Sequence, residues 1–248
     1  MWFFQHLTGP IAAFSLGIAG LAAGAVVRPP QPLAAGEVLR YTWQLEGIVG
    51  AIAGLFFPDA GTGSLTTVPE GDGLLRTELL ITSEKSREGE FWTYGALIDV
   101  REGRTVRAWS AYRFRGEAKY KEEEITGAGV VDLASGIYRL RKDPPTDPRR
   151  MRIWSDGKIY PVLVTPGESV VRQRDGERIE GREYTIQGVD VPGERFWSGR
   201  LDLVLAEDPE STPVEIAVQR SWTQVRLLLA DPAGVGASTA SLGGERGG

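Results

Sequence analysis

The sequence has no cysteine and a single histidine, His6, which lies in an apolar segment near the N-terminus. Without cysteine the chain cannot form a disulfide, use a thiolate nucleophile, bind zinc through sulfur or carry an acylated lipobox cysteine. If the N-terminal segment is removed, no imidazole remains, which excludes Ser-His-Asp and Cys-His catalysis, histidine metal ligands and pH sensing near neutrality. The sequence therefore argues against an enzyme that uses imidazole or thiol chemistry, and we expect a binding or assembly protein.

An excess of positive charge is also absent, because the net charge is −5 and the isoelectric point is about 5.2. Nucleic-acid-binding domains are usually strongly basic, so we expect no nucleic-acid partner. Calcium loops of the D-x-D-x-D-G kind are missing. Gly61 and Gly63 begin a glycine-rich phosphate pattern, but Thr66 stands where the third glycine is needed, which predicts a plain loop. We therefore expect no cofactor, name no catalytic or metal-binding residue, and leave the ligand-binding residues unknown.

Charged residues are missing from the N-terminus as far as Arg28, and residues 11–27 are rich in Ala, Gly, Leu, Ile and Val. This composition predicts a signal peptide over residues 1–25, cleaved after Ala25, and a Pro-rich spacer over residues 26–35. Residues 1–27 are also long enough to span a bilayer, so an uncleaved inner-membrane anchor is the alternative. Both interpretations place the rest of the chain outside the cytoplasm, in the periplasm.

From Gly36 onward, apolar residues recur at every second position, which is typical of half-buried β-strands. Clear runs are Leu39 to Leu45, Leu75 to Ile81, Val106 to Phe114, Leu201 to Leu205, Val214 to Val218 and Val225 to Leu229. We expect a single β-rich domain over residues 36–230. Residues 231–248 are mostly small and polar, and we expect them to be disordered. The stretch 48–63 is apolar without a clear period, and a strand entering a loop is one interpretation.

Turn signals separate these runs. Glu102-Gly103, Asp156-Gly157 and Asp175-Gly176 each favour a tight hairpin, since glycine tolerates positive φ, and they predict an antiparallel meander. Pro161 lacks an N–H donor, which predicts that its strand lies at a sheet edge or contains a bulge.

One segment has helical rather than strand periodicity. Asp132 is a good N-cap, Leu133, Ile137 and Leu140 fall on one helical face, and Pro144-Pro145 stops the helix. Cationic side chains in the last turn favour the helix C-terminus electrostatically. We predict one short helix whose apolar face packs on the sheet.

Charged residues offer two candidate chemistries. Paired carboxylates can catalyse glycoside hydrolysis, and the available acids are Glu122, Glu123, Glu124, Asp132, Glu168, Glu177 and Glu180. The alternative for Glu122 to Glu124 is a solvated charge run. A basic stretch could bind lipid phosphates or form an outer strand face balanced by nearby acids; it comprises Arg101, Arg104, Arg107, Arg113, Arg115, Lys119, Lys121, Arg139, Arg141, Lys142, Arg149, Arg150 and Arg152.

The order of several short motifs resembles the bacterial exported family known as domain of unknown function 3108 (DUF3108), over residues 36–229. Gly36 to Tyr41 resembles its opening G-E-x-L-x-Y strand, and Gly47 to Gly50 its G-I-x-x-G segment. Asp132 to Arg141 is similar to its D-L-L-S-A-L-Y-x-x-R helix, with departures at Ala134 and Gly136. Asp208 to Ile216 resembles its acidic turn followed by P-V-x-I.

The resemblance implies a periplasmic protein without assigned catalytic residues. It also implies a lipoprotein-carrier-like fold, mostly β (α+β), in which a strongly curved antiparallel sheet or incomplete barrel holds one short helix against its concave face.

Three functions follow from these observations. The first is a non-catalytic envelope protein that binds a lipid or another hydrophobic ligand. The second is a scaffold that binds an envelope protein through strand edges or the basic stretch. The third is a carboxylate-dependent hydrolase of glycan or lipid, which requires two acids converging in a pocket. Membrane contact through residues 1–27 is expected if they are not cleaved.

Overall fold

The computed structural model describes residues 36–46, 60–84, 89–114, 116–174, 176–220 and 223–231. The strands and the helix in these ranges are β1 (Glu37–Glu46), β2 (Ala60–Gly71), β3 (Leu74–Ser83), β4 (Phe91–Asp99), β5 (Arg104–Phe114), β6 (Glu117–Glu124), β7 (Val130–Val131), α2 (Leu133–Lys142), β8 (Arg149–Ser155), β9 (Lys158–Arg174), β10 (Glu177–Gly188), β11 (Arg200–Ala206), β12 (Pro213–Arg220) and β13 (Thr223–Asp231). Our predictions for residues 1–35, 47–59 and 232–248 lie outside the described residues.

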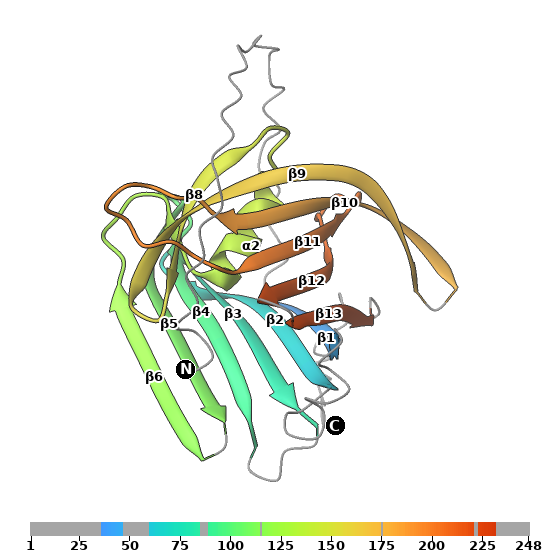
Figure 1. Ribbon diagram of the computed structural model, residues 1–248, viewed down its shortest axis with the longest axis horizontal. Coiled ribbons are helices and arrows are strands. Elements are labelled where there is room, and N and C mark those ends of the chain that lie inside the picture. The colour runs from blue at the N-terminus through green and yellow to red at the C-terminus, as the bar shows by residue number, and fades with distance from the viewer. Residues whose placement is uncertain are drawn as a thin grey trace, which may run out of the picture.

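All described strands belong to one 13-stranded sheet in the order β6-β5-β4-β3-β2-β1-β13-β12-β11-β10-β9-β8-β7. Every pair is antiparallel except β7 with β8. The sheet is strongly curved, and its edge strands β6 and β7 form no ladder with each other in the described part of the chain, so it is not closed into a barrel (Figure 1). The predicted mostly-β curved sheet is confirmed.

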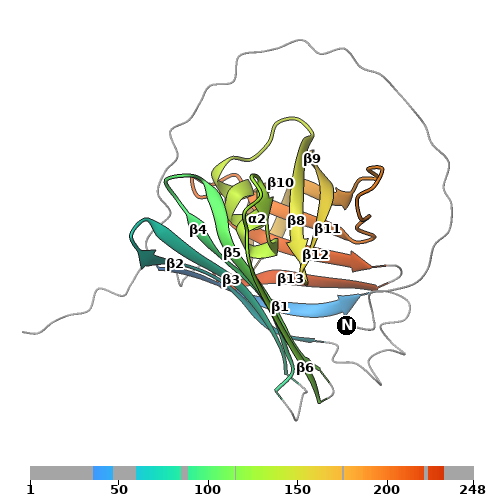
Figure 2. The same ribbon diagram turned by 90° about the vertical axis from the view of Figure 1, so that its left-hand side faces the viewer.

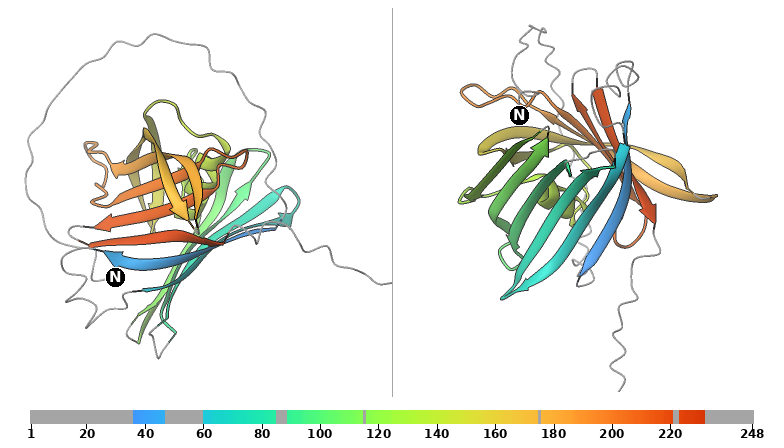
Figure 3. Two further views of the ribbon diagram at one scale, coloured as in Figure 1. Left: turned by 90° about the vertical axis from the view of Figure 1, so that its right-hand side faces the viewer. Right: turned by 90° about the horizontal axis from the view of Figure 1, so that it is seen from below.

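The first and last strands of the described chain are neighbours in the middle of this sheet (Figure 3, left). Tyr41 is opposite Leu229 and Trp43 is opposite Leu227. All four side chains are buried on the same face, which we call the inner face. The alternate apolar residues of β1 therefore lie opposite the alternate apolar residues of β13.

Helix α2 lies on the inner face, within the curve of the sheet, against β3, β4, β7 and β8 (Figure 2). Its capping box is reciprocal: the Asp132 carboxylate accepts from the backbone N–H groups of Ala134 and Ser135, and Ser135 Oγ accepts from the Asp132 N–H. Ala134, Ile137 and Leu140 are buried in the main core. The predicted helix and its N-cap are confirmed.

The predicted hairpin turns are confirmed at Gly103 and at Asp156-Gly157. Gly103 has φ of 62° between β4 and β5. Asp156 and Gly157 have φ of 54° and 76°, the left-handed pair that a two-residue type I′ hairpin requires.

The prediction of an edge strand at Pro161 was wrong, and the bulge in this strand lies elsewhere than at Pro161. Strand β9 lies between β8 and β10, and Pro161 is opposite Arg152 in unbroken register. The Pro161 carbonyl accepts from the Val189 N–H, just past the end of β10. In an antiparallel ladder the N–H and C=O of a residue face the same neighbouring strand. The nitrogen of Pro161 therefore faces the end of β10, and its missing N–H removes no hydrogen bond to β8. The irregularity in the β9–β10 ladder lies instead at Arg182 and Tyr184.

The loop predicted at Gly61 and Gly63 was also wrong, because both residues lie in β2. A Cβ on Gly61 would lie 2.5 Å from Nε1 of Trp43. The glycine therefore makes room for the indole, which donates to the Thr82 carbonyl at 2.8 Å.

Candidate functional site

The acids considered for catalysis have structural partners in four cases. The buried Asp132 caps α2, and burial raises its pKa to about 6. Glu123 accepts from the Trp154 indole at 2.7 Å, Glu122 pairs with Arg107, and Glu180 pairs with Arg178. The described residues contain no group of three or more acids or histidines arranged to hold a metal ion.

Four arginines of the basic stretch pair with nearby acids. Ion pairs join Arg104 to Glu102, Arg107 to Glu122, Arg149 to Asp143 and Arg152 to Glu194. The arginines of these pairs are exposed by about two fifths to one half of the side chain. This arrangement supports the interpretation of a charged outer surface.

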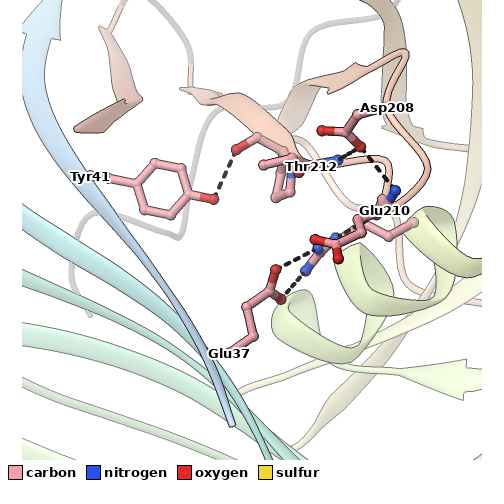
Figure 4. A network of polar contacts seen from close by, with 7 residues as sticks. Glu37, Tyr41, Asp208, Glu210 and Thr212 are labelled. Carbon is pink, nitrogen blue, oxygen red and sulfur yellow. Dashed lines mark hydrogen bonds and ion pairs between the residues drawn. The ribbon is translucent and has the colours of Figure 1, made fainter. Parts of the chain in front are cut away.

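A polar network, buried at Glu37, Tyr41 and Arg141, joins β1, α2 and the β11–β12 connection (Figure 4). Arg141 donates two hydrogen bonds to the Glu37 carboxylate, at 2.6 and 2.9 Å, and the two side chains are 1% and 3% exposed. Tyr41 donates its hydroxyl to the Pro213 carbonyl at 2.9 Å, and burial raises the pKa of this phenol. Asp208 accepts from the backbone of Glu210 and Thr212 at 3.0 Å each and so shapes the turn.

This network unites three of the four segments in which the sequence resembles DUF3108. Glu37 and Tyr41 lie in the first segment, Arg141 ends the helical segment, and Asp208 and Pro213 lie in the last. Glu37, Tyr41 and Arg141 are buried, and the exposed Asp208 holds the turn that follows β11 through backbone hydrogen bonds. We therefore assign these positions to fold stability.

Four aromatic side chains on the inner face lie outside both core clusters. We call Trp92 and Tyr94 of β4, with Tyr112 and Phe114 of β5, the aromatic face. Trp92 is opposite Tyr112, and the Trp92 and Phe114 ring centroids are 5.6 Å apart. All four side chains are half-buried, and none belongs to either core cluster. By contrast, Ala96 of β4, which faces the same side, is fully buried.

The tip of the β8–β9 hairpin borders the aromatic face. Ser110, one inward position before Tyr112 on β5, donates to Asp156 at 2.9 Å. Nearby, Trp154 packs with Ala108, Ile125 and Val130 in a second, smaller core cluster. The hairpin thus covers the inner side of β5 at Ala108 and Ser110, and the aromatic face begins just beyond it.

Strand β6 places charged side chains beside the aromatic face. The register sets Glu117 opposite Phe114, Lys119 opposite Tyr112 and Lys121 opposite Ser110, so all three share the inner face. Partial burial raises the pKa of Tyr112, and the nearby carboxylates of Glu117 and Asp156 raise it further.

Comparisons with known proteins identify the fold. No family model matches the chain, and no curated protein matches it. The DUF3108 resemblance is therefore not confirmed. The structure is similar to the crystal structure of a beta-barrel-like protein of domain of unknown function DUF1849 from Brucella abortus, with a TM-score of 0.50 and 9% identity over 79% of this chain and 96% of that one. The hypothetical lipoprotein YmcC from Escherichia coli is more distant, with a TM-score of 0.33 and 10% identity over 82% and 90% of the two chains.

The sequence contained a signal for the aromatic face that our sequence analysis did not use. The predicted run Val106 to Phe114 includes Tyr112 and Phe114 two positions apart, but no predicted run includes Trp92 and Tyr94. Aromatic residues at every second position on two consecutive strands were the available sign. Which of them leave the core depends on where α2 and the β8–β9 hairpin lie, and periodicity carries no such information.

Proposed function

We propose that this chain is a non-catalytic envelope protein that binds a lipid acyl chain or a similar hydrophobic ligand on the aromatic face. The observation that carries the proposal is the half-buried state of four aromatic rings on the concave side of the sheet, outside both core clusters. Contiguous apolar surface of this kind in a soluble fold is characteristic of interaction sites.

The energetics favour an apolar ligand. Burying apolar surface contributes about 25 cal/mol per Å², and one aromatic side chain can bury roughly 150–250 Å². Covering the exposed parts of four adjacent rings therefore contributes several kcal/mol toward binding, and the apolar surface of the ligand that is buried against them adds to this. The envelope location rests on the uncharged apolar N-terminal segment of the sequence. No helix among the described residues is both long and apolar enough to cross a membrane.

The alternative of a protein scaffold has less support from the geometry. Strand β6 lies at the edge of the sheet formed by the described strands, but its sequence EAKYKEEE carries six charges in eight residues. Charged edge strands, lysine-bearing ones above all, discourage pairing with another strand. The hydrolase alternative would need two acids in a cleft, and four of the seven candidate acids already serve structural contacts.

A matched pair of variants tests the proposal. Phe114 and Phe91 are both half-buried on adjacent strands, but Phe91 is opposite Arg113 on the outer face. Titration of the full chain with the fluorescent fatty acid cis-parinaric acid should show saturable binding. Phe114→Ala should weaken it about fivefold or more, whereas Phe91→Ala should leave it unchanged.

Circular dichroism and the unfolding midpoint confirm that both variants remain folded. Saturable binding that is equally strong in both variants would place the ligand elsewhere and overturn the proposal. A complete lack of binding by the unsubstituted chain would overturn it as well.

A further inference from the structure

The charges on the two faces of β6 differ in a way that points to a ligand head group. On the outer face, Glu122 pairs with Arg107 and also accepts from Tyr120. On the inner face, Glu117 and Lys121 are exposed and form no ion pair with any residue that the structure describes. Glu117 and Lys121 carry opposite charges and flank the aromatic face on the same side of the sheet.

The spacing of these charges fits a small dipolar group. Glu117 and Lys121 are four residues apart on one strand, which separates their Cα atoms by about 13 Å. Long glutamate and lysine side chains reaching toward each other reduce this distance to the size of a phospholipid head group. Lys119 lies between them, opposite Tyr112, and adds a second cation near Lys121.

The charged residues beside the aromatic face include both signs, so they do not favour a ligand head group that carries charge of one sign. Lys119 and Lys121 contribute two positive charges, and Glu117 and Asp156 contribute two negative charges close enough to raise the pKa of the Tyr112 phenol. A purely anionic head group would meet both acids, and a purely cationic one would meet both lysines. A head group with a phosphate and an ammonium satisfies both sets.

We propose that the aromatic face selects zwitterionic phospholipids, with the lipid phosphate at Lys121 and its ammonium at Glu117. This proposal rests on the proposed function, since the acyl chain occupies the aromatic face. The ligand class is a phosphodiester with a primary or quaternary amine, such as phosphatidylethanolamine. An anionic lipid of the phosphatidylglycerol type shares the phosphate but lacks the ammonium.

Calorimetric titration of the full chain with lysophospholipids tests this selection. The lipids have identical acyl chains, stay below their micellar concentrations and carry either an ethanolamine or a glycerol head group. We expect the ethanolamine lipid to bind about fivefold more tightly, the factor typical of one exposed charge contact. Lys121→Gln should weaken both lipids. Glu117→Gln should weaken the ethanolamine lipid alone and abolish the preference.

Two outer-face variants serve as controls. Arg113→Gln removes a positive charge from the outer face of β5, and Glu124→Gln removes a negative charge from the outer face of β6. Neither should change the head-group preference. Equal binding of the two lipids, tighter binding of the glycerol lipid, or an unchanged preference in Glu117→Gln would overturn the head-group assignment. In those cases sensitivity to Phe114→Ala would show that the aromatic face still binds lipid, whereas no binding of either lipid would mean that the proposed function itself fails.

Discussion

Removing Arg141 should destabilise the fold far more than removing any surface arginine. Its guanidinium makes two hydrogen bonds to Glu37 at 2.6 and 2.9 Å, with both side chains almost fully buried. In Arg141→Met, the Glu37 carboxyl stays buried without its cation, and such losses cost about 3–5 kcal/mol. Domains of this kind have total stabilities of about 5–15 kcal/mol, so the change is a large fraction of the free energy of unfolding.

Urea unfolding of the full chain, followed by tryptophan fluorescence, measures this cost. The matched control is Arg152→Met, because the Arg152–Glu194 pair is 49% and 37% exposed, and its loss should cost under about 1 kcal/mol. The double variant Glu37→Met/Arg141→Met should be more stable than Arg141→Met, since an apolar pair leaves no buried charge. The reasoning fails if Arg141→Met costs no more than Arg152→Met, or if the double variant loses the sum of the two single costs.

Two further substitutions test the helix cap and the sheet. Burial raises the pKa of Asp132 from 3.8 to about 6 on folding, so between these pH values the folded state keeps a proton that the unfolded state has released. This protonation contributes about 3 kcal/mol to the free energy of unfolding. The contribution is complete below pH 4 and is lost as the pH rises to 6. Urea midpoints of the unsubstituted chain relative to Asp132→Asn should therefore fall over this window, and a constant difference would contradict the burial argument. A Cβ on Gly95 would lie 2.3 Å from the Trp109 ring, which also stacks under the Arg76 guanidinium at 4.9 Å, so Gly95→Ala should cost about 1–3 kcal/mol. The same substitution in a Trp109→Ala background should cost much less by thermal unfolding, and equal costs in both backgrounds would show that the ring is not responsible.

Local features of the fold could be predicted from the sequence because they depend on neighbouring residues. Asp132 followed by apolar residues at helical spacing predicted α2, and Asp156-Gly157 predicted its hairpin. Pro161 shows the limit of this reasoning. A missing N–H matters only when the ladder would use it, and the neighbour that faces Pro161 depends on the order of strands.

The buried ion pair and the aromatic face could not be predicted, since both depend on contacts distant in sequence. Glu37 and Arg141 are 104 residues apart, and both are residue types that usually lie on the protein surface. The aromatic face differs from the core in that its four side chains stay half-buried. Trp43 and Trp92 occupy equivalent alternating positions on their strands, yet the fold buries the first and leaves the second half-buried.

The pairing of β1 with β13 determines when this sheet can be completed. Strand β1 precedes the other described strands in the sequence, and one of its two neighbours, β13, ends at Asp231. Strands β1 to β6 can form successive hairpins as they emerge, but they join the β7–β13 half only after nearly the whole chain is available. Such non-local closure makes folding slow, on the scale of milliseconds to seconds. Unpaired strand edges favour aggregation, so the edge of β1 that pairs with β13 carries this risk until β13 has been synthesised.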